Sequence, residues 1–145
     1  MSLKRINTVV TTAFILFIIW FGLEFVLAPE STAPTFGLPS WPSGDGGGFL
    51  VIKGIRDLTL ALVLAVLLLT GHRRALGWVL LAESFAAFGD MTTVLAHDGS
   101  TATALGVHGL TAAAMVGSGL LMLRETRKPT TAPATPTATP APQPA

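Results

Sequence analysis

The chain has 145 residues, of which 50% are hydrophobic and only 12% charged, and its formal net charge at pH 7 is +1. A soluble domain usually carries roughly 25% charged residues, so this composition and the mean hydropathy of +0.64 indicate an integral membrane protein. The small net charge gives no reason to expect a nucleic acid as a partner. Cysteine is absent, which excludes disulfides, thiolate metal sites and thiol catalysis within these residues.

Four apolar segments are long enough to cross the roughly 30 Å hydrocarbon core of a membrane, which takes roughly 20 helical residues. They cover about residues 8–27, 50–70, 75–96 and 103–123, and none of them contains proline. The ten prolines lie between the first two segments or after the fourth, where they interrupt no helix. We therefore predict an all-α fold, a four-transmembrane-helix bundle formed by residues 8–124.

The first segment follows Lys4 and Arg5, as the apolar region of a signal peptide would. This apolar region is longer than the roughly 7–15 residues usual in signal peptides, and Glu24 interrupts its end. We therefore expect it to stay in the protein as a membrane helix.

The basic residues predict the orientation of the bundle, because cytoplasmic loops are enriched in Lys and Arg. With four crossings, seven of the nine basic residues fall on one side, which places both termini in the cytoplasm of a multi-pass protein of the cell membrane. These seven residues are Lys4, Arg5, Arg73, Arg74, Arg124, Arg127 and Lys128.

Three segments lie outside the predicted helices. Residues 1–7 form a cytoplasmic N-terminus, and residues 125–145 form a disordered cytoplasmic tail rich in Pro, Thr and Ala. The connection 28–49 is longer than a simple connector, and its residues Phe36, Leu38 and Trp41 suggest that part of it lies on the outer membrane surface.

The second segment contains the two basic residues that break this bias, Lys53 and Arg56, followed directly by Asp57. The uncharged run 58–69 covers only roughly 18 Å as a helix, which is too short to span a membrane. The helix must therefore draw these three charges into the outer hydrocarbon, where Arg56 and Asp57 need partners.

Partners of matching depth are present on the other three segments, as Glu24, Asp90 and His108. Lys53 and Asp57 are also spaced i,i+4, so they share a helix face. A further acid, Glu83, lies near mid-membrane with no base at its depth, and we expect it to be protonated or to reach a polar pocket. The predicted binding cluster is Arg56, Asp57, Asp90, His108, Glu83, Lys53 and Glu24.

Two interpretations of this cluster remain open. It forms either a buried ion-pair network that specifies helix packing, or a polar pocket that opens to the outer face and binds a ligand or moves protons. A metal site built from Asp90, His97 and His108 matches no known ligand spacing, so we predict no metal and no cofactor. The small residues Gly109, Ala113 and Gly117 predict a ridge for close helix packing.

The sequences KGIRDL (53–58), GHRRALGW (71–78), GD (89–90) and VHG (107–109) resemble, in this order, a family of small membrane proteins catalogued as domain of unknown function 4267. The resemblance covers roughly residues 8–124, and it is fairly specific because charged motifs inside membrane spans are rare. It implies a four-helix fold and a distant kinship with DoxX-like membrane proteins, and it implies no activity.

Three hypotheses for the function follow. The first is a small membrane protein that binds or transports an anionic or protonatable ligand, with Arg56 on the anionic group and Asp57, Asp90 and Glu83 on protons. The second is an accessory subunit whose ion pairs only fix its assembly. The third and weakest is a membrane enzyme that uses Asp90, Glu83 and His108 as acid–base groups on a lipophilic substrate; the sequence assigns no catalytic residue. The expected partners are the lipid bilayer and a second copy or another membrane subunit.

Overall fold

A computed structural model describes residues 2–127, and the predicted tail beyond residue 127 lies outside the described residues. Within that range the fold is all-α. The long helices are α1 (Leu3–Leu27), α3 (Gly48–Leu69), α4 (Arg73–Ala96) and a continuous helix made of α5 (Thr101–Thr103), η3 (Ala104–Gly109) and α6 (Leu110–Glu125). Each of them overlaps one predicted span. Glu125, assigned by the sequence to the tail, is the last residue of α6.

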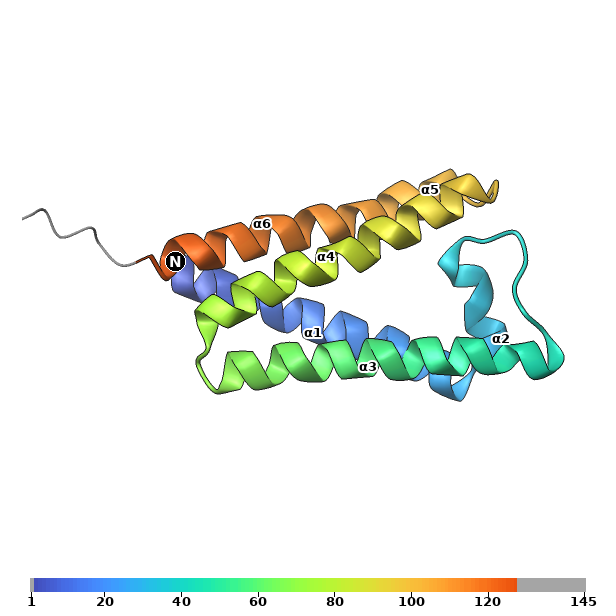
Figure 1. Cartoon of the computed structure of the whole chain (residues 1–145), viewed down its shortest axis with the longest axis horizontal. Coiled ribbons are helices and arrows are strands. Elements are labelled where there is room, and N and C mark those ends of the chain that lie inside the picture. The colour runs from blue at the N-terminus through green and yellow to red at the C-terminus, as the bar shows by residue number, and fades with distance from the viewer. Residues whose placement is uncertain (1, 128–145) are drawn as a thin grey trace, which may run out of the picture.

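The long helices form two antiparallel hairpins, as Figure 1 shows. Helix α1 packs mainly on α3, and α4 packs mainly on α6. One end of the molecule, called here the basic end, carries Lys4, Arg5, Arg73, Arg74, Arg124 and Arg127. The opposite end, called the loop end, carries the two connections 28–47 and 97–100. The hairpins diverge toward the loop end (Figure 1).

Glycines allow the two helices of each hairpin to approach closely. A Cβ atom built on Gly54 of α3 would lie 2.6 Å from the carbonyl oxygen of Gly22 on α1. In the other hairpin, a Cβ atom on Gly119 of α6 would lie 2.9 Å from the carbonyl oxygen of Gly77 on α4. Each hairpin is therefore built around a glycine pair at which the two backbones meet.

The predicted ridge of Gly109, Ala113 and Gly117 does not make such a contact as a unit. A Cβ atom on Gly117 would meet nothing within 4 Å, and Ala113 is exposed. The close approach of the two backbones runs through Gly119 instead. The prediction of a packing ridge was therefore wrong for Ala113 and Gly117, whereas a Cβ atom on Gly109 would lie 2.9 Å from Met91 Sδ of α4.

Three helices in the described range are long and apolar enough to cross a membrane: Leu3–Leu27, Arg73–Ala96 and Thr101–Glu125. Helix α3 has a similar length, but every stretch of 18 residues within it contains Lys53, Arg56 and Asp57. Helix α3 is on average as apolar as the other three, and it differs from them only in carrying three charged residues in every such stretch, while residues 58–69 carry none.

The side-chain distribution is that of a small bundle with an apolar exterior. A buried cluster joins the two hairpins, and many large apolar side chains such as Leu16, Trp20 and Phe85 are exposed. An exterior of this kind suits a lipid environment, because lipid chains cover it as favourably as protein would. The members of the buried cluster are Ile15, Leu64, Leu76, Leu80, Met115 and Met122.

The basic end is held together by one ion pair. Arg73 donates from Nε to Glu125 Oε1 at 2.6 Å and from Nη2 to Oε2 at 2.9 Å, and Asn7 Nδ2 donates to the same Oε2 at 2.9 Å. Arg73 also donates from Nη1 to the hydroxyl of Thr8 at 3.2 Å. A two-pronged arginine–carboxylate pair fixes both distance and orientation, so it fastens the ends of α1, α4 and α6.

The loop end is closed by the connection between α1 and α3, which contains α2 (Pro29–Thr32), η1 (Ala33–Phe36) and η2 (Gly44–Gly47). Gly37 follows η1 with φ of 98°, a conformation that favours glycine, and its carbonyl oxygen accepts from the Ser100 N–H at 2.8 Å. This turn directs Phe36 inward, where it is half-buried, whereas the sequence placed Phe36 on the membrane surface.

Candidate functional site

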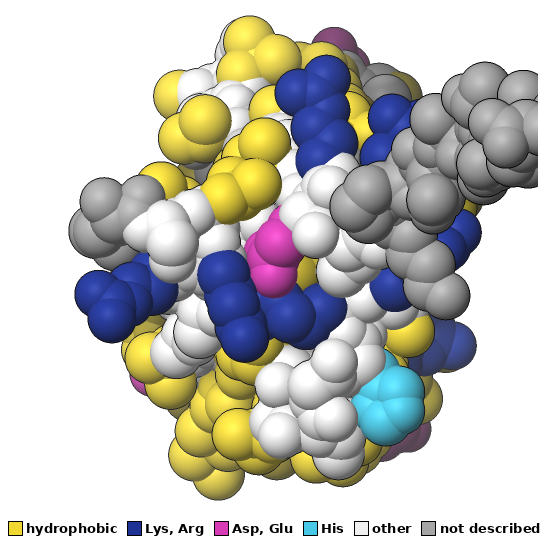
Figure 2. Space-filling model, turned by 90° about the vertical axis from the view of Figure 1, so that its left-hand side faces the viewer, with side chains coloured by type: hydrophobic (Ala, Val, Ile, Leu, Met, Phe, Trp, Pro, Cys, Tyr) yellow, Lys and Arg dark blue, Asp and Glu magenta, His cyan; other side chains and the backbone are white. Residues whose placement is uncertain are grey.

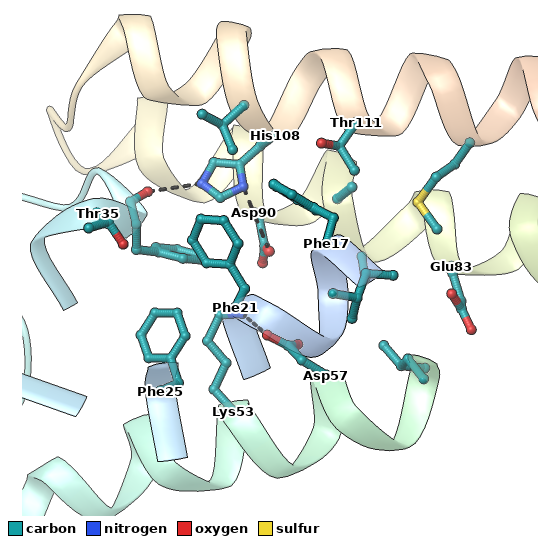
Figure 3. Close-up of a pocket in the computed structure, with 17 residues that line it drawn as sticks. Phe17, Phe21, Phe25, Thr35, Lys53, Asp57, Glu83, Asp90, His108 and Thr111 are labelled. Atoms are coloured by element: carbon teal, nitrogen blue, oxygen red, sulfur yellow. Dashed lines mark hydrogen bonds and ion pairs between the residues drawn. The ribbon is translucent and has the colours of Figure 1, made fainter. Parts of the chain in front are cut away.

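A partly open cavity of about 120 Å³ lies between the two hairpins at the loop end. Its ionisable side chains come from α3, α4 and η3, as Figure 3 shows, while phenylalanines from α1 and η1 supply an apolar wall. The ionisable residues that line it are Lys53, Asp57, Glu83, Asp90 and His108. These are five of the seven residues that the sequence assigned to the cluster.

Lys53 is fully engaged by its neighbours. Its Nζ atom lies 2.7 Å from Asp57 Oδ2, one helical turn further along α3. The same ammonium lies 4.9 Å from the ring centroid of Phe25 and 5.2 Å from that of Phe36. A carboxylate and two aromatic faces together compensate the charge of this half-buried ammonium. The spacing i,i+4 predicted this pair, and the structure contains it.

His108 enters the cavity from an irregular part of its helix. In η3 the backbone forms a π-helical turn, seen in the hydrogen bond from the Leu110 N–H to the Leu105 carbonyl five residues earlier. Such turns insert one residue into a helix and are frequent at functional sites. His108 Nε2 lies 2.9 Å from the backbone oxygen of Phe36, and the two rings are 4.7 Å apart between centroids.

The hydrogen bond to Phe36 fixes the tautomer of neutral His108. A backbone carbonyl can only accept, so Nε2 carries the hydrogen and Nδ1 is left as an acceptor. Nδ1 lies 4.0 Å from Asp90 Oδ2, which is too far for a direct hydrogen bond. Two acceptor atoms therefore face the same part of the cavity with no hydrogen between them, unless His108 takes up a second proton or a bound group donates to both.

Glu83 lies at the other side of the cavity. In Figure 3 its side chain lies apart from those of Lys53, Asp90 and His108. The side chain is only 9% exposed, and neither carboxyl oxygen has a hydrogen-bond partner among residues 2–127. Buried polar atoms are almost always hydrogen-bonded, so this unsatisfied group needs an explanation. The sequence identified Glu83 as unusual for the same reason, since no base lies at its depth.

The aromatic wall was missed at the level of the sequence. Phe17, Phe21 and Phe25 all line the cavity from α1, and the rings of Phe17 and Phe21 are 4.9 Å apart between centroids. Their spacing of four residues was the available signal, because residues at i, i+4 and i+8 share one face of a helix. In a helix that is apolar on all sides, however, such a stripe is not conspicuous.

Comparison with known proteins assigns the chain to a family. The model of the family described as domain of unknown function (DUF4267) matches residues 15–122. The chain belongs to the DUF4267 family. All residues that line the cavity, from Phe17 to Met115, fall inside the matched range. No curated protein and no solved structure matches the chain.

Two predicted residues of this DUF4267 protein do not line the cavity. Glu24 on α1 and Arg56 on α3 are both exposed, although they have the depth that the sequence gave them. His97 is likewise exposed at the end of α4, with its Nδ1 3.0 Å from the Thr93 oxygen. In the part of the chain that the structure describes, no three His, Asp or Glu side chains converge as they would around a metal ion.

The cavity of this chain thus combines aromatic walls with an excess of hydrogen-bond acceptors. Lys53 and Asp57 satisfy one another, whereas Asp90 and Glu83 accept no hydrogen bond from residues 2–127, nor does Nδ1 of His108 when the ring is neutral. Such a site is suited to a small molecule with an apolar body and a donating, positively charged group.

Proposed function

We propose that this protein binds a small protonatable amine with an apolar body in the cavity at the loop end. The observation that carries the proposal is the pair of acceptors, His108 Nδ1 and Asp90 Oδ2, which lie 4.0 Å apart. One ammonium group can donate to both at bond lengths of about 2.8 Å each, since its hydrogens diverge at nearly tetrahedral angles. The bond to Asp90 is charge-assisted and therefore the stronger of the two.

The rest of the cavity supports a ligand of this class. Phe17, Phe21 and Phe25 offer aromatic faces, which attract both an apolar body and a cation. Its volume of about 120 Å³ is slightly below the about 150 Å³ of a cavity that holds benzene, and the cavity is partly open, so it suits one aromatic ring whose substituent lies toward the opening.

An anionic ligand is less well supported by the arrangement of charges. Arg56 was the residue expected to hold an anionic group, and its exposed side chain does not line the cavity. Lys53 lines it, but its ammonium already contacts Asp57 and two aromatic rings. The proposal therefore keeps the protonatable alternative and gives Arg56 no role in binding.

We further propose that α3 crosses the membrane together with the three apolar helices, with both termini in the cytoplasm and the cavity near the outer surface. The pairing of Lys53 with Asp57 supports this topology, because an ion pair costs less to place in a membrane than two separate charges do. Two of the three charges of α3 are paired in this way. If the protein also transports its ligand, four helices leave little room for a conduit, so a second copy or a partner subunit would complete it.

The binding proposal is tested with three probes of nearly equal shape and different charge: benzylamine, benzyl alcohol and benzoate. The purified full chain in a nonionic detergent is titrated with each probe at pH 7, and binding is followed by calorimetry and by the shift of the unfolding midpoint. We expect benzylamine to bind at least about tenfold more tightly than benzoate, a difference of about 1.4 kcal/mol.

Asp90→Asn should weaken the binding of benzylamine by about tenfold or more, because it removes the charge that the ammonium contacts. Glu24→Gln is the matched control, since Glu24 is an acid at similar depth that lies outside the cavity. Tighter binding of benzoate than of benzylamine, or equal losses in the two variants, would overturn the proposal.

A structural accessory subunit is the second candidate, and the engagement of Lys53 favours it. In this case His108 carries two protons and pairs with Asp90, and the network only fixes the loop end. The ¹⁵N chemical shifts of the His108 ring separate the candidates, because an imidazolium and a neutral ring with hydrogen on Nε2 give different patterns. A neutral ring in the ligand-free protein supports the binding site, and an imidazolium supports the structural network.

A further inference from the structure

A second hollow lies at the basic end, far from the cavity described above. It is a groove of about 660 Å³ between α4 and α6, lined by Arg74 and Trp78 on one side and by Gly117, Leu120 and Arg124 on the other, with Arg127 at its end. Nothing in the proposed function uses this groove. Its volume is much larger than that of the cavity at the loop end.

The groove concentrates positive charge without a compensating acid. Arg74, Arg124 and Arg127 are all exposed, and none of them forms an ion pair with another residue in the range 2–127. Glu125 lies close in sequence, but Arg73 and Asn7 occupy its carboxylate. Figure 2 shows Lys and Arg side chains gathered over this end, around an acidic side chain near the middle of the face in view.

The part of the groove beside Trp78, Gly117 and Leu120 is apolar. A Cβ atom on Gly117 would meet nothing within 4 Å, so the groove is open at this position. Leu120 is 50% exposed and Trp78 58% exposed. Tryptophan is typical of the boundary between hydrocarbon and headgroups, so this side chain indicates the depth at which the groove passes from polar to apolar.

We infer that the groove binds one anionic phospholipid. The phosphate lies between Arg74 and Arg124, whose guanidinium groups donate to its oxygens, and an acyl chain runs along Leu120 past Gly117. Charge complementarity selects this occupant, because the cation of a zwitterionic headgroup would cancel the charge of its phosphate beside three arginines. An apolar helix would leave these arginines without partners. Helix α4 begins at Arg73, next to Arg74, so the positive end of its dipole adds to the positive potential at this end of the groove.

The test compares lipids that differ only in the headgroup. The purified full chain in a nonionic detergent is mixed with phosphatidylglycerol or with phosphatidylcholine of the same acyl chains, and retained lipid is counted by native mass spectrometry. We expect retention of one phosphatidylglycerol per chain in clear preference to phosphatidylcholine. The double substitution Arg74→Gln with Arg124→Gln should reduce this preference by roughly tenfold or more.

Two further variants make the test specific to the groove. Lys4→Gln with Arg5→Gln removes the same number of charges from the same end of the molecule, outside the groove, and should leave retention unchanged. Gly117→Leu fills the apolar part without touching the arginines, and should lower retention of phosphatidylglycerol. Folding of each variant is checked by its circular dichroism and its elution volume.

Several outcomes would overturn the inference. Equal losses in the two double variants would mean that the whole basic end attracts anionic lipid without a defined site. Unchanged lipid retention in Gly117→Leu would mean that no acyl chain lies in the groove. A dimer that Gly117→Leu dissociates while lipid retention stays the same would assign the groove to a second copy of the chain.

Discussion

At the scale of single residues, Glu83 is predicted to lower the stability of the protein rather than to contribute to it. Its two carboxyl oxygens are buried and have no partner within residues 2–127. Leaving such a group unsatisfied costs about 1–3 kcal/mol. Glu83→Leu should therefore raise the free energy of unfolding by about 1 kcal/mol or more, measured by thermal or denaturant unfolding in detergent. The exposed acid Glu30 supplies the control variant, Glu30→Leu, which should change stability much less. Loss of stability in Glu83→Leu would contradict the absence of a partner.

Arg73 and Arg74 are adjacent in sequence but differ in what they contact. Arg73 makes a two-pronged pair with Glu125, and both side chains are 14% exposed. Arg74 is exposed and forms no ion pair with a described residue. Arg73→Gln should lower the free energy of unfolding by about 2 kcal/mol, because it leaves the carboxylate of Glu125 without its main donor. Arg74→Gln, measured without added lipid, should change it by less than about 0.5 kcal/mol. Similar values for both would show that the pair with Glu125 contributes little.

The individual residues also show what the sequence could and could not predict about the site. Depth along each helix followed from counting residues, and on this basis Lys53, Asp57, Asp90 and His108 were correctly placed at one level. Counting residues did not show toward which side of the helix a side chain points. In a soluble helix the polar face marks the outside, whereas these helices are apolar on all sides. Glu24 and Arg56 therefore have the predicted depth and the opposite direction, away from the cavity.

At the scale of elements, the glycine pair between α1 and α3 sets the distance between these two helices. A Cβ atom on Gly54 would lie 2.6 Å from the Gly22 oxygen and 2.8 Å from a Val26 methyl group. Gly54→Ala should therefore destabilise the protein by about 1–3 kcal/mol, although alanine is the better helix former. Gly117→Ala is the matched control, because nothing lies within 4 Å and the propensity gain of about 1 kcal/mol is undisturbed. Both are measured by thermal unfolding, and stabilisation by Gly54→Ala would contradict the close crossing.

The π-helical turn of η3 is the element that the sequence could not predict. The apolar run 103–123 indicates one regular helix, and no proline or charge marks the inserted residue. The turn depends on tertiary contacts, since His108 donates to the Phe36 oxygen and a Cβ atom on Gly109 would lie only 2.9 Å from Met91 Sδ. The position of His108 in the cavity is therefore decided jointly by its own helix and by the connection 28–47.

At the scale of the whole molecule, the two hairpins are joined differently at their two ends. Toward the basic end they are connected by an apolar cluster and by the hydrogen bonds from Asn7 to Glu125 and from Arg73 to Thr8. Toward the loop end they diverge, and the space between them is occupied by the cavity and by the inward-facing η1 (Figure 1). A bundle whose hairpins are in contact at one end and separated at the other can hold a ligand between them without rearranging its core.

The topology can be tested because the chain contains no cysteine, so one introduced thiol reports one position. Exposed residues suitable for substitution are Ser2 and His72 at the basic end, and Ser43 and Ser100 at the loop end. If α3 crosses the membrane, a membrane-impermeant maleimide added to intact cells should label Ser43→Cys and Ser100→Cys, and label Ser2→Cys and His72→Cys only after permeabilisation.

The pair Ser43 and His72 is decisive, because α3 is the only long helix between these residues; the short η2 and residues 70–71 are the rest. A helix α3 lying on the surface would place both on the same side, since its three charges would then stay in the headgroup region. Opposite labelling requires the charges to enter the bilayer. It would mean that the pair of Lys53 with Asp57 and the aromatic rings beside it lower the cost of insertion enough for residues 58–69 to bring the helix across.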